Sequence, residues 1–250
     1  MSLIPYSAGL RLFSRLLAIG IAIAGMSGCQ QDPLLDGDDF RDFYPIDSGC
    51  YVQYQVDSIR YRYATPVQFR DTVRYQWMEV IGDTFYDATG QTQYRVECWR
   101  RADSNASWQI DRIGAISAYS SRIEKVEDDV RYIRLVFPVA DGIKWNGNSF
   151  APDNGSFEFL KNWEYIYEAV NRSFTVPYGI FSSTCRVVET DQENLVEKMR
   201  SQVVYARDVG PIYREWERLQ AAGGEIVNDW QNGRMDGFRI RWQLIGYGKK

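Results

Sequence analysis

Apolar and polar residues alternate along most of the chain after residue 50, and this period of two constrains the fold more than any other feature. The run at 51–63 reads YVQYQVDSIRYRY, and 72–83, 93–100 and 237–247 follow the same pattern. Successive side chains of a β-strand point to opposite faces, so such a run buries one face and exposes the other. A sheet with one buried face is typical of antiparallel strands. The sequence therefore predicts a chain of half-buried antiparallel strands.

The first of these runs changes phase in its middle. Apolar residues at even positions give way to apolar residues at odd positions: Val52, Tyr54 and Val56, then Ile59, Tyr61 and Tyr63. A β-bulge inserts one extra residue into a strand and would keep all of these side chains on a single face. We therefore expect a bulge at Asp57-Ser58.

Further runs of the same kind occupy most of the remaining chain. They cover 108–119, 130–139, 163–170 and 201–219, and the last is divided by a turn at 209–211. About ten such runs, spaced by roughly 8–12 residues, predict an all-β architecture. The content of 17 Tyr, 12 Phe and 8 Trp supports this, because aromatic side chains favour strands.

Helical periodicity is sparse by comparison. Residues 190–199 open with a Thr190–Glu193 capping pattern, which predicts either a short helix or only a turn. The expected fold class is therefore mainly β: a single antiparallel, strongly curved sheet, half-barrel or sandwich-like, with few short helices. Because no Pro/Ser-rich break follows residue 46, we expect residues 46–250 to form one domain.

The first 28 residues have the organisation of an export signal. An apolar run at 16–26 follows the basic residues Arg11 and Arg15. The run is shorter than the roughly 20 residues that span a bilayer. The segment Met26-Ser27-Gly28-Cys29 then resembles the lipobox of bacterial lipoproteins. In that family the Cys thiol receives a diacylglyceryl group and the leader is cut before it. The resemblance implies a signal peptide at 1–28 and lipidation of Cys29.

Residues 29–45 follow as a polar, acidic stretch that contains Pro33 and Gly37, which is typical of a flexible tether. Gln30 rather than Asp follows Cys29, and by the sorting rule of enteric bacteria this implies the outer membrane. One acyl chain binds a membrane marginally, whereas two or three hold it stably. We expect a protein anchored to the outer membrane by lipid, facing either the periplasm or the cell exterior.

The chain contains no histidine, and this excludes several kinds of chemistry. Histidine-based triads, Cys–His dyads and HExxH zinc sites cannot be built. The net charge of −4, with no cluster of Lys and Arg, argues against nucleic-acid binding. Because phosphate-binding loops and CxxC pairs are also missing from the sequence, we expect neither a cofactor nor a metal site.

Three cysteines remain once Cys29 is acylated: Cys50, Cys98 and Cys185. The compartment reached by export is oxidising, so one disulfide is an expectation. We favour Cys98–Cys185, because both residues fall within strand candidates. The alternative is that all three are small buried residues.

Aromatic residues in the alternating runs are the candidates for a ligand-facing surface. Those singled out are Tyr54, Tyr61, Trp163, Tyr165 and Tyr167. Some of these rings must fill the core, since strands of this type bury one face, while others can face a hydrophobic ligand or an envelope protein partner. The function we expect is therefore a binding or assembly role in the envelope, without catalysis.

The alternative function is a carboxylate-dependent glycan hydrolase or a glycan-binding accessory lipoprotein. The carboxylates that lie near aromatic residues in the sequence are Glu158, Glu164, Glu168, Glu189 and Glu215. A hydrolase needs two carboxylates facing each other across the bond that is cut. This alternative therefore requires two of the five to converge in the fold.

Three segments, 43–61, 133–148 and 203–217, resemble an uncharacterised group of Bacteroidota lipoproteins. Members carry a Tyr-Pro-x-x-x-Gly segment soon after the lipid-bearing Cys, and here the matching residues are Tyr44, Pro45 and Gly49. They also carry a Tyr-Ala-x-x-Val-Gly turn between two strands, and here the matching residues are Tyr205, Ala206, Val209 and Gly210. The resemblance implies an outer-membrane or periplasmic lipoprotein and no established activity.

Overall fold

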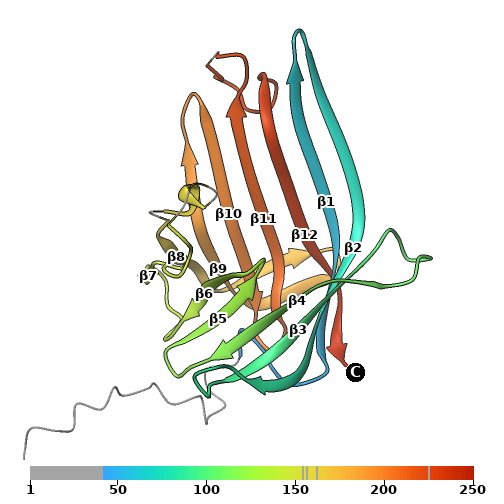
Figure 1. The fold of residues 1–250 in the computed structure, drawn as a ribbon, viewed down its shortest axis with the longest axis vertical. Helices are drawn as coiled ribbons and strands as arrows, with labels where there is room; N and C mark the ends of the chain where they lie inside the picture. The colour runs from blue at the N-terminus through green and yellow to red at the C-terminus, as the bar shows by residue number, and fades with distance from the viewer. Residues whose placement is uncertain (1–41, 154, 156, 162, 225) are drawn as a thin grey trace, which may run out of the picture. The chain divides into compact units, whose positions relative to one another are not determined.

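The computed structural model describes residues 42–250 except 154, 156, 162 and 225, and these residues form a twelve-stranded antiparallel sheet (Figure 1). The elements are β1 (Cys50–Ala64), β2 (Val67–Tyr86), β3 (Thr92–Arg101), β4 (Gln109–Ala118), β5 (Arg122–Glu127), β6 (Val130–Val136), β7 (Lys144–Trp145), the 3-10 turn η2 (Glu158–Leu160), β8 (Tyr165–Val176), β9 (Gly179–Glu193), β10 (Glu197–Ala206), β11 (Gly210–Ala221) and β12 (Met235–Lys249). The predicted fold class, a curved antiparallel sheet with few helices, is confirmed. Cys29 and the rest of the leader lie outside the described residues.

The strand order is β6-β5-β4-β3-β2-β1-β12-β11-β10-β9-β8-β7. Two meanders, β1 to β6 and β7 to β12, are therefore joined in the middle of the sheet by the pairing of β1 with β12. The stretch 190–199, for which the sequence left a helix or a turn open, is the hairpin between β9 and β10. In the part of the chain that the structure describes, no helix has the length and apolar character needed to cross a membrane.

The sheet curls until its two edges meet in its lower part. The amide of Ile133 on β6 donates to the carbonyl of Gly147 at 2.8 Å, and Trp145 Nε1 on β7 donates to the carbonyl of Ile133 at 2.9 Å. The Tyr167 hydroxyl on β8 completes the contact, because it bonds both the amide and the carbonyl of Val136. Above this closed part, β1, β2 and β9 to β12 continue upward as an open, curved wall (Figure 1).

The phase change in β1 does not arise from a bulge at Asp57-Ser58. From Val56 to Tyr61 the strand keeps an uninterrupted register with both β2 and β12. Instead, the buried face changes sides: the main core lies inside the closed part, while a second apolar cluster covers the outer face higher up. The second cluster consists of Tyr61, Leu219, Val227, Trp230 and Met235. The segment between β11 and β12 supplies two of these side chains, so it folds back over the outside of the sheet.

The packed domain begins before residue 46. Phe43, Tyr44 and Ile46 are all buried in the main core. Arg207 lies over the Phe43 ring at 4.8 Å and pairs with the carboxylate of Asp42. The last residues of the predicted tether, 29–45, therefore belong to the fold, because their aromatic side chains have apolar surface to bury.

Candidate functional site

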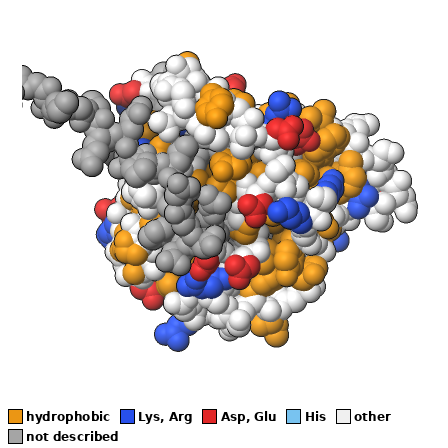
Figure 2. Space-filling view, turned by 90° about the horizontal axis from the view of Figure 1, so that it is seen from below, with side chains coloured by type: hydrophobic (Ala, Val, Ile, Leu, Met, Phe, Trp, Pro, Cys, Tyr) orange, Lys and Arg blue, Asp and Glu red, His pale blue; other side chains and the backbone are white. Residues whose placement is uncertain are grey.

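The strongest candidate site is an apolar hollow at the lower end of the sheet, which we name the basal pocket. Its volume is about 280 Å3. Five short segments surround it: 44–45, 50–52, 79–81, 208–211 and 247–249. Figure 2 looks onto this end of the molecule, where hydrophobic side chains gather in patches between acidic and basic ones.

The two sequence motifs meet at the basal pocket. The Tyr44 and Tyr205 rings pack with centroids 5.9 Å apart. Gly210 begins β11 with a φ of +96°, and a Cβ built there would lie 3.6 Å from Cδ of Pro45. The positive φ favours glycine and turns the β10–β11 hairpin tightly against the Tyr-Pro segment. The motifs therefore build two adjoining walls of one hollow.

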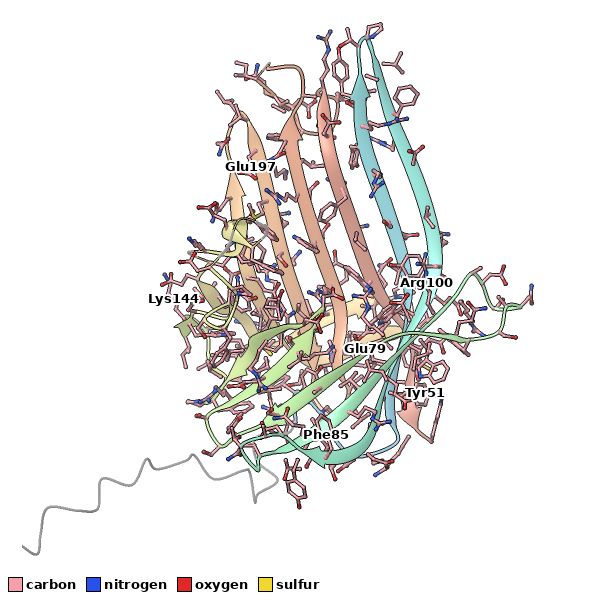
Figure 3. All side chains as sticks on the ribbon, in the orientation of Figure 1. Tyr51, Glu79, Phe85, Arg100, Lys144 and Glu197 are labelled. Carbon is pink, nitrogen blue, oxygen red and sulfur yellow. The ribbon has the colours of Figure 1, made fainter. Side chains whose placement is uncertain are left out.

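Two carboxylate residues line this hollow, Glu79 from the interior side and Asp208 at the β10–β11 turn. The Glu79 side chain is 16% exposed and accepts a hydrogen bond from Lys125 Nζ at 2.8 Å. Its other oxygen is 3.4 Å from Trp77 Nε1, a long contact that leaves acceptor capacity free. Glu79 and Tyr51 both lie in the lower part of the sheet, below Arg100 (Figure 3). A ligand in the basal pocket would thus meet largely apolar walls, the carboxylate of Glu79, and the charged residues Asp208 and Lys249.

Behind Glu79 lies a buried network that we name the interior charge cluster. Its members are Glu79, Lys125, Glu127, Arg134, Glu189 and Arg214. Lys125 joins Glu79 to Glu127, with 2.9 Å from Nζ to the Glu127 carboxylate. Arg134 joins Glu127 to Glu189 at 2.5 and 2.7 Å. Three basic and three acidic groups therefore balance inside the closed part of the sheet.

Glu127 and Lys125 stay ionised in the cluster although they are buried. Burial alone would raise the pKa of Glu127, but the charges of Arg134, Lys125 and Arg214 outweigh it and hold that pKa well below its usual range. Burial would likewise lower the pKa of Lys125, but Glu127 and Glu79 hold it well above its usual value. The remaining interior space beside the cluster is about 40 Å3, enough for a water molecule but not for a larger ligand.

The predicted ligand-facing aromatics fill the core instead. Tyr54, Tyr61, Trp163, Tyr165 and Tyr167 are between 0% and 5% exposed. Several hydroxyls bond within the protein: Tyr54 donates to the Pro211 carbonyl at 2.7 Å, and Tyr165 donates to Asn148 at 2.8 Å. Burial raises the pKa of Tyr54 well above its usual value, so its hydroxyl stays neutral. Tyr54, Trp163, Tyr165 and Tyr167 belong to the main core, whereas Tyr61 belongs to the second apolar cluster on the outer face, so alternation alone did not show which face of each strand is covered.

The expected Cys98–Cys185 disulfide is not formed, and all three cysteines in the described part of the chain are free thiols. Cys98 lies on β3 and Cys185 on β9, with five strands between them in the sheet order. Burial raises the pKa of the Cys185 thiol to about 12 and that of Cys98 further, so both stay protonated. Cys50 is only half-buried and lines the basal pocket, a position that its spacing in the sequence did not indicate.

The glutamates named for hydrolysis bind separate partners. Glu164 pairs with Lys144 and Glu168 with Arg186, both at 2.6 Å near the surface. Glu189 belongs to the interior charge cluster, Glu158 is exposed on η2, and Glu215 pairs with Arg241 at 3.3 Å. By strand register Glu215 lies on the outer face of the sheet, opposite to the face that carries Glu189. A catalytic pair is not evident in this arrangement.

No family model and no curated protein matches this chain. One solved structure that does match is that of a protein from Bacteroides fragilis, described as exported and as having a YmcC-like fold. The match is 12% identical, covers 83% of this chain and 99% of that chain, and has a TM-score of 0.37. A similarity this low carries no argument about function.

Proposed function

We propose that this protein is a lipid-anchored, non-catalytic binding protein of the outer membrane that holds a small hydrophobic ligand in the basal pocket. The observation that carries the ligand is a largely apolar hollow of about 280 Å3 with the partly free carboxylate of Glu79 in its interior wall. The anchor is supported by the signal-like leader and by the lipobox that ends at Cys29.

The size and charge of the basal pocket define the ligand class. A dry cavity of about 150 Å3 can hold benzene, so a hollow of about 280 Å3 has room for roughly two rings or a comparable aliphatic body. The interior charge cluster is balanced, so Glu79 requires no added cation and can accept a hydrogen bond from a neutral group. We therefore assign the pocket to a neutral, largely apolar molecule with one hydroxyl or N–H donor.

The ionisation of the cluster favours binding over hydrolysis. A general acid or base works best with a pKa near the operating pH. The pKa of Glu127 is held well below its usual range and that of Lys125 well above, so neither is poised to exchange protons near neutrality. The cluster stabilises the interior and presents Glu79 to the pocket without offering a proton donor.

Ligand entry can be blocked at the β10–β11 turn. The full chain bearing Cys29→Ser is used, because this substitution removes acyl chains that could compete for the pocket. We expect it to bind N-phenyl-1-naphthylamine, and binding should raise the fluorescence of this probe. This probe is a neutral, apolar arylamine with one N–H donor. Val209→Trp should weaken binding about tenfold or more, because the indole fills space that Val209 leaves free.

The matched control for that variant is Ile180→Trp. Ile180 is 76% exposed and does not line the basal pocket, so the same large side chain there should leave probe binding unchanged. Thermal unfolding confirms that both variants fold. Equal probe binding by wild type and Val209→Trp would overturn the assignment of the pocket.

A second readout uses the wild-type thiol in the pocket wall. Cys50 is the half-buried thiol among the described cysteines, so N-ethylmaleimide should label it before Cys98 and Cys185. The arylamine probe should slow labelling of Cys50, as followed by peptide mass spectrometry, because both occupy one hollow. Unchanged labelling at a saturating probe concentration would place the probe elsewhere.

The anchor has its own test, which is independent of the pocket. Cys29→Ser should abolish acylation and move the protein from the membrane fraction to the soluble fraction of the envelope, since the leader alone is too short to hold it. Immunoblots of fractionated cells and intact mass measure the two effects. Retention of the variant in the membrane fraction would show that the anchor lies elsewhere.

A further inference from the structure

The upper half of β2 has one edge to which no strand is paired. β2 pairs with β1 from residue 67 down to residue 80, whereas β3 pairs with β2 only over residues 76–86. Among the residues that the structure describes, no strand pairs with the other side of residues 67–75. We name this segment the β2 free edge. It stands above the closed part, and the β3–β4 hairpin projects sideways below it (Figure 1).

The β2 free edge is exposed on both of its faces. All of residues 67–74 except Gln68 are exposed, and three of them are apolar: Val67 at 48%, Phe69 at 38% and Val73 at 52%. The side chains that face the inner side of the sheet are those of Val67, Phe69, Asp71, Val73 and Tyr75, because Tyr75 is directly opposite the buried Val56. An edge of this kind presents unpaired N–H and C=O groups beside apolar side chains, which is a template for strand pairing.

The inner side chains are arranged symmetrically about Asp71. Two apolar residues lie on each side of it, at positions 67 and 69 and at positions 73 and 75. If two identical edges pair antiparallel over their full length, Asp71 meets its own counterpart, Phe69 meets Val73 of the second copy, and Val67 meets Tyr75. This register covers the exposed apolar side chains in four apolar pairs.

We propose that two copies of this chain pair through the β2 free edge, antiparallel and with Asp71 at the two-fold axis. The interface is the same patch on both copies, as a closed two-fold dimer requires. The free edge begins at residue 67 and ends at residue 75, so its midpoint fixes this register. A strand from a different protein would gain nothing from the symmetry about Asp71.

The central pair of Asp71 carboxylates is the one unfavourable contact on the inner face. Arg60 on β1 is directly opposite Asp71, so the row across the four strands is Arg60, Asp71, Asp71 and Arg60. With equal spacing between strands, the attractions between each Arg60 and the Asp71 of the other copy reduce the repulsion to about one third of that of an isolated pair. Four apolar pairs therefore face a like-charge contact that is mostly compensated.

The outer face of the same pairing brings no further like charges directly opposite each other. In this register Arg70 meets Thr72 of the second copy, and Arg74 meets Gln68. Arg74 is already paired with Asp57 at 2.6 Å. The outer face thus tolerates the pairing, and the apolar inner face favours it.

The β3–β4 hairpin leaves room for the second copy. A hollow of about 660 Å3 lies between this hairpin and the lower end of the β2 free edge, and Val73, Tyr75, Arg100 and Ile110 are among its lining residues. Figure 3 shows Arg100 at the foot of the edge. Because Val67 of the second copy is opposite Tyr75, the β1–β2 turn of that copy enters the hollow. The turn would cover Ile110, which is 52% exposed.

The size of the edge predicts a weak dimer. Nine residues at about 3.3 Å each give a paired edge of about 30 Å, which is small for a stable interface. Confinement to a membrane surface raises the effective concentration and would compensate. This step alone rests on the proposed lipid anchor, whereas the pairing itself does not.

The anchor also sets the orientation of such a dimer. Antiparallel pairing directs the basal ends of the two copies away from each other. Thirteen residue steps separate Cys29 from Asp42, and they can span roughly 45 Å when extended. Both lipid anchors therefore reach one membrane if the strands lie along its surface.

A disulfide at the two-fold axis tests the register. Asp71→Cys in the otherwise unchanged chain is oxidised with copper phenanthroline in the cell fraction that holds the protein, and dimers are followed by non-reducing immunoblot. Opposite Cα atoms of paired antiparallel strands are about 4.5–5.5 Å apart, within the reach of a disulfide. We expect this dimer to form at least about tenfold faster than with Val73→Cys, whose two copies lie about 13 Å apart along the strands.

Two controls accompany this comparison. The parent chain without an added cysteine gives the background from the half-buried Cys50. Adding Phe69→Lys to Asp71→Cys should slow dimer formation about tenfold, because it breaks two of the four apolar pairs. Ile180→Lys, at a residue of β9 that is 76% exposed and remote from the edge, should leave the rate unchanged. Retained binding of the arylamine probe shows that each variant is folded, and it separates this proposal from the basal pocket.

Three results would overturn the proposal. Equal rates for Asp71→Cys and Val73→Cys would mean that the copies meet only by random collision. A faster reaction of Val73→Cys would mean that the edges pair in another register, without Asp71 at the axis. A disulfide between Asp71→Cys and a different envelope protein, with no homodimer, would assign the edge to a strand of that protein instead.

Discussion

Replacing Arg134 with Met should lower the free energy of unfolding by about 3–5 kcal/mol, the cost of leaving a buried charge without its partner. Arg134 is the group that joins Glu127 to Glu189, and its side chain is itself buried. Glu127 keeps Lys125 and Arg214 in the variant, whereas Glu189 loses its ion pair and keeps the hydrogen bond from the hydroxyl of Ser201. Urea unfolding followed by tryptophan fluorescence measures the loss.

The control for this variant is an exposed arginine with a pair of similar geometry. Arg200 bonds Asp191 through two nitrogens, at 3.3 and 3.0 Å, on the surface. Surface pairs contribute at most about 1 kcal/mol, so Arg200→Met should have a small effect. Equal losses in the two variants would contradict the role assigned to the interior charge cluster.

The pH dependence shows whether the loss comes from charge or from packing. The pKa of Glu127 is lowered in the folded protein, so its contribution is fully present above its unfolded pKa and is lost as the pH falls through the folded pKa. The gap between wild type and Arg134→Met should therefore be largest near neutral pH and should narrow in acid. A difference in unfolding free energy that does not change with pH would indicate that the loss comes from poor packing of Met and not from the missing charge.

The closed interior was not predictable from the sequence because its decisive side chains are charged. The segment 122–127 reads RIEKVE and gives no apolar alternation, yet it is β5 and places Lys125 in the interior. Charged residues are rarely buried unless paired. The partner Glu79 is 46 residues away on β2, so nothing local marks Lys125 as internal. The fold was predictable from alternation, but this network was not.

The sequence predicted more about the residues around the basal pocket than about the upper wall of the sheet. The Tyr-Pro and Tyr-Ala-x-x-Val-Gly segments, identified through a resemblance, proved to be neighbours around the basal pocket. On the upper wall, alternation in β1 pointed to Tyr61 as inward-facing, whereas Arg60 and Arg62 hold the inward positions. Periodicity divides the residues of a strand between two faces but does not show which face is buried. The covering segment between β11 and β12 decides that, and it comes from far along the chain.

One glycine of β12 lies where the second apolar cluster packs on the sheet. Gly237 on β12 is opposite Leu219 on β11 and Tyr61 on β1, below the second apolar cluster. Its φ is +136°, and a Cβ built there would lie 2.1 Å from the carbonyl oxygen of Arg218. A side chain would therefore meet backbone that cannot move without breaking the pairing of β11 with β12.

Gly237→Ala should cost about 2–5 kcal/mol, from backbone strain together with overpacking. The matched control is Gly246→Ala on the same strand, where a Cβ would meet only Gln53 at ordinary contact distances of 3.7 and 3.8 Å. That change should be neutral or slightly stabilising, because glycine within a strand is entropically costly. Thermal unfolding of the two variants measures the difference.

The consequence for the upper wall can be measured separately from global stability. Phe238 follows Gly237 and faces inward beside Arg60 and Arg218, so a shift of β12 at Gly237 displaces the Phe238 ring. Gly237→Ala should therefore raise hydrogen exchange in upper β11 and β12 while amides near Glu79 in the closed part stay protected. Uniform exchange throughout the sheet would instead mean that the wall and the closed part unfold as one unit, and that Gly237 has no separate role in the upper wall.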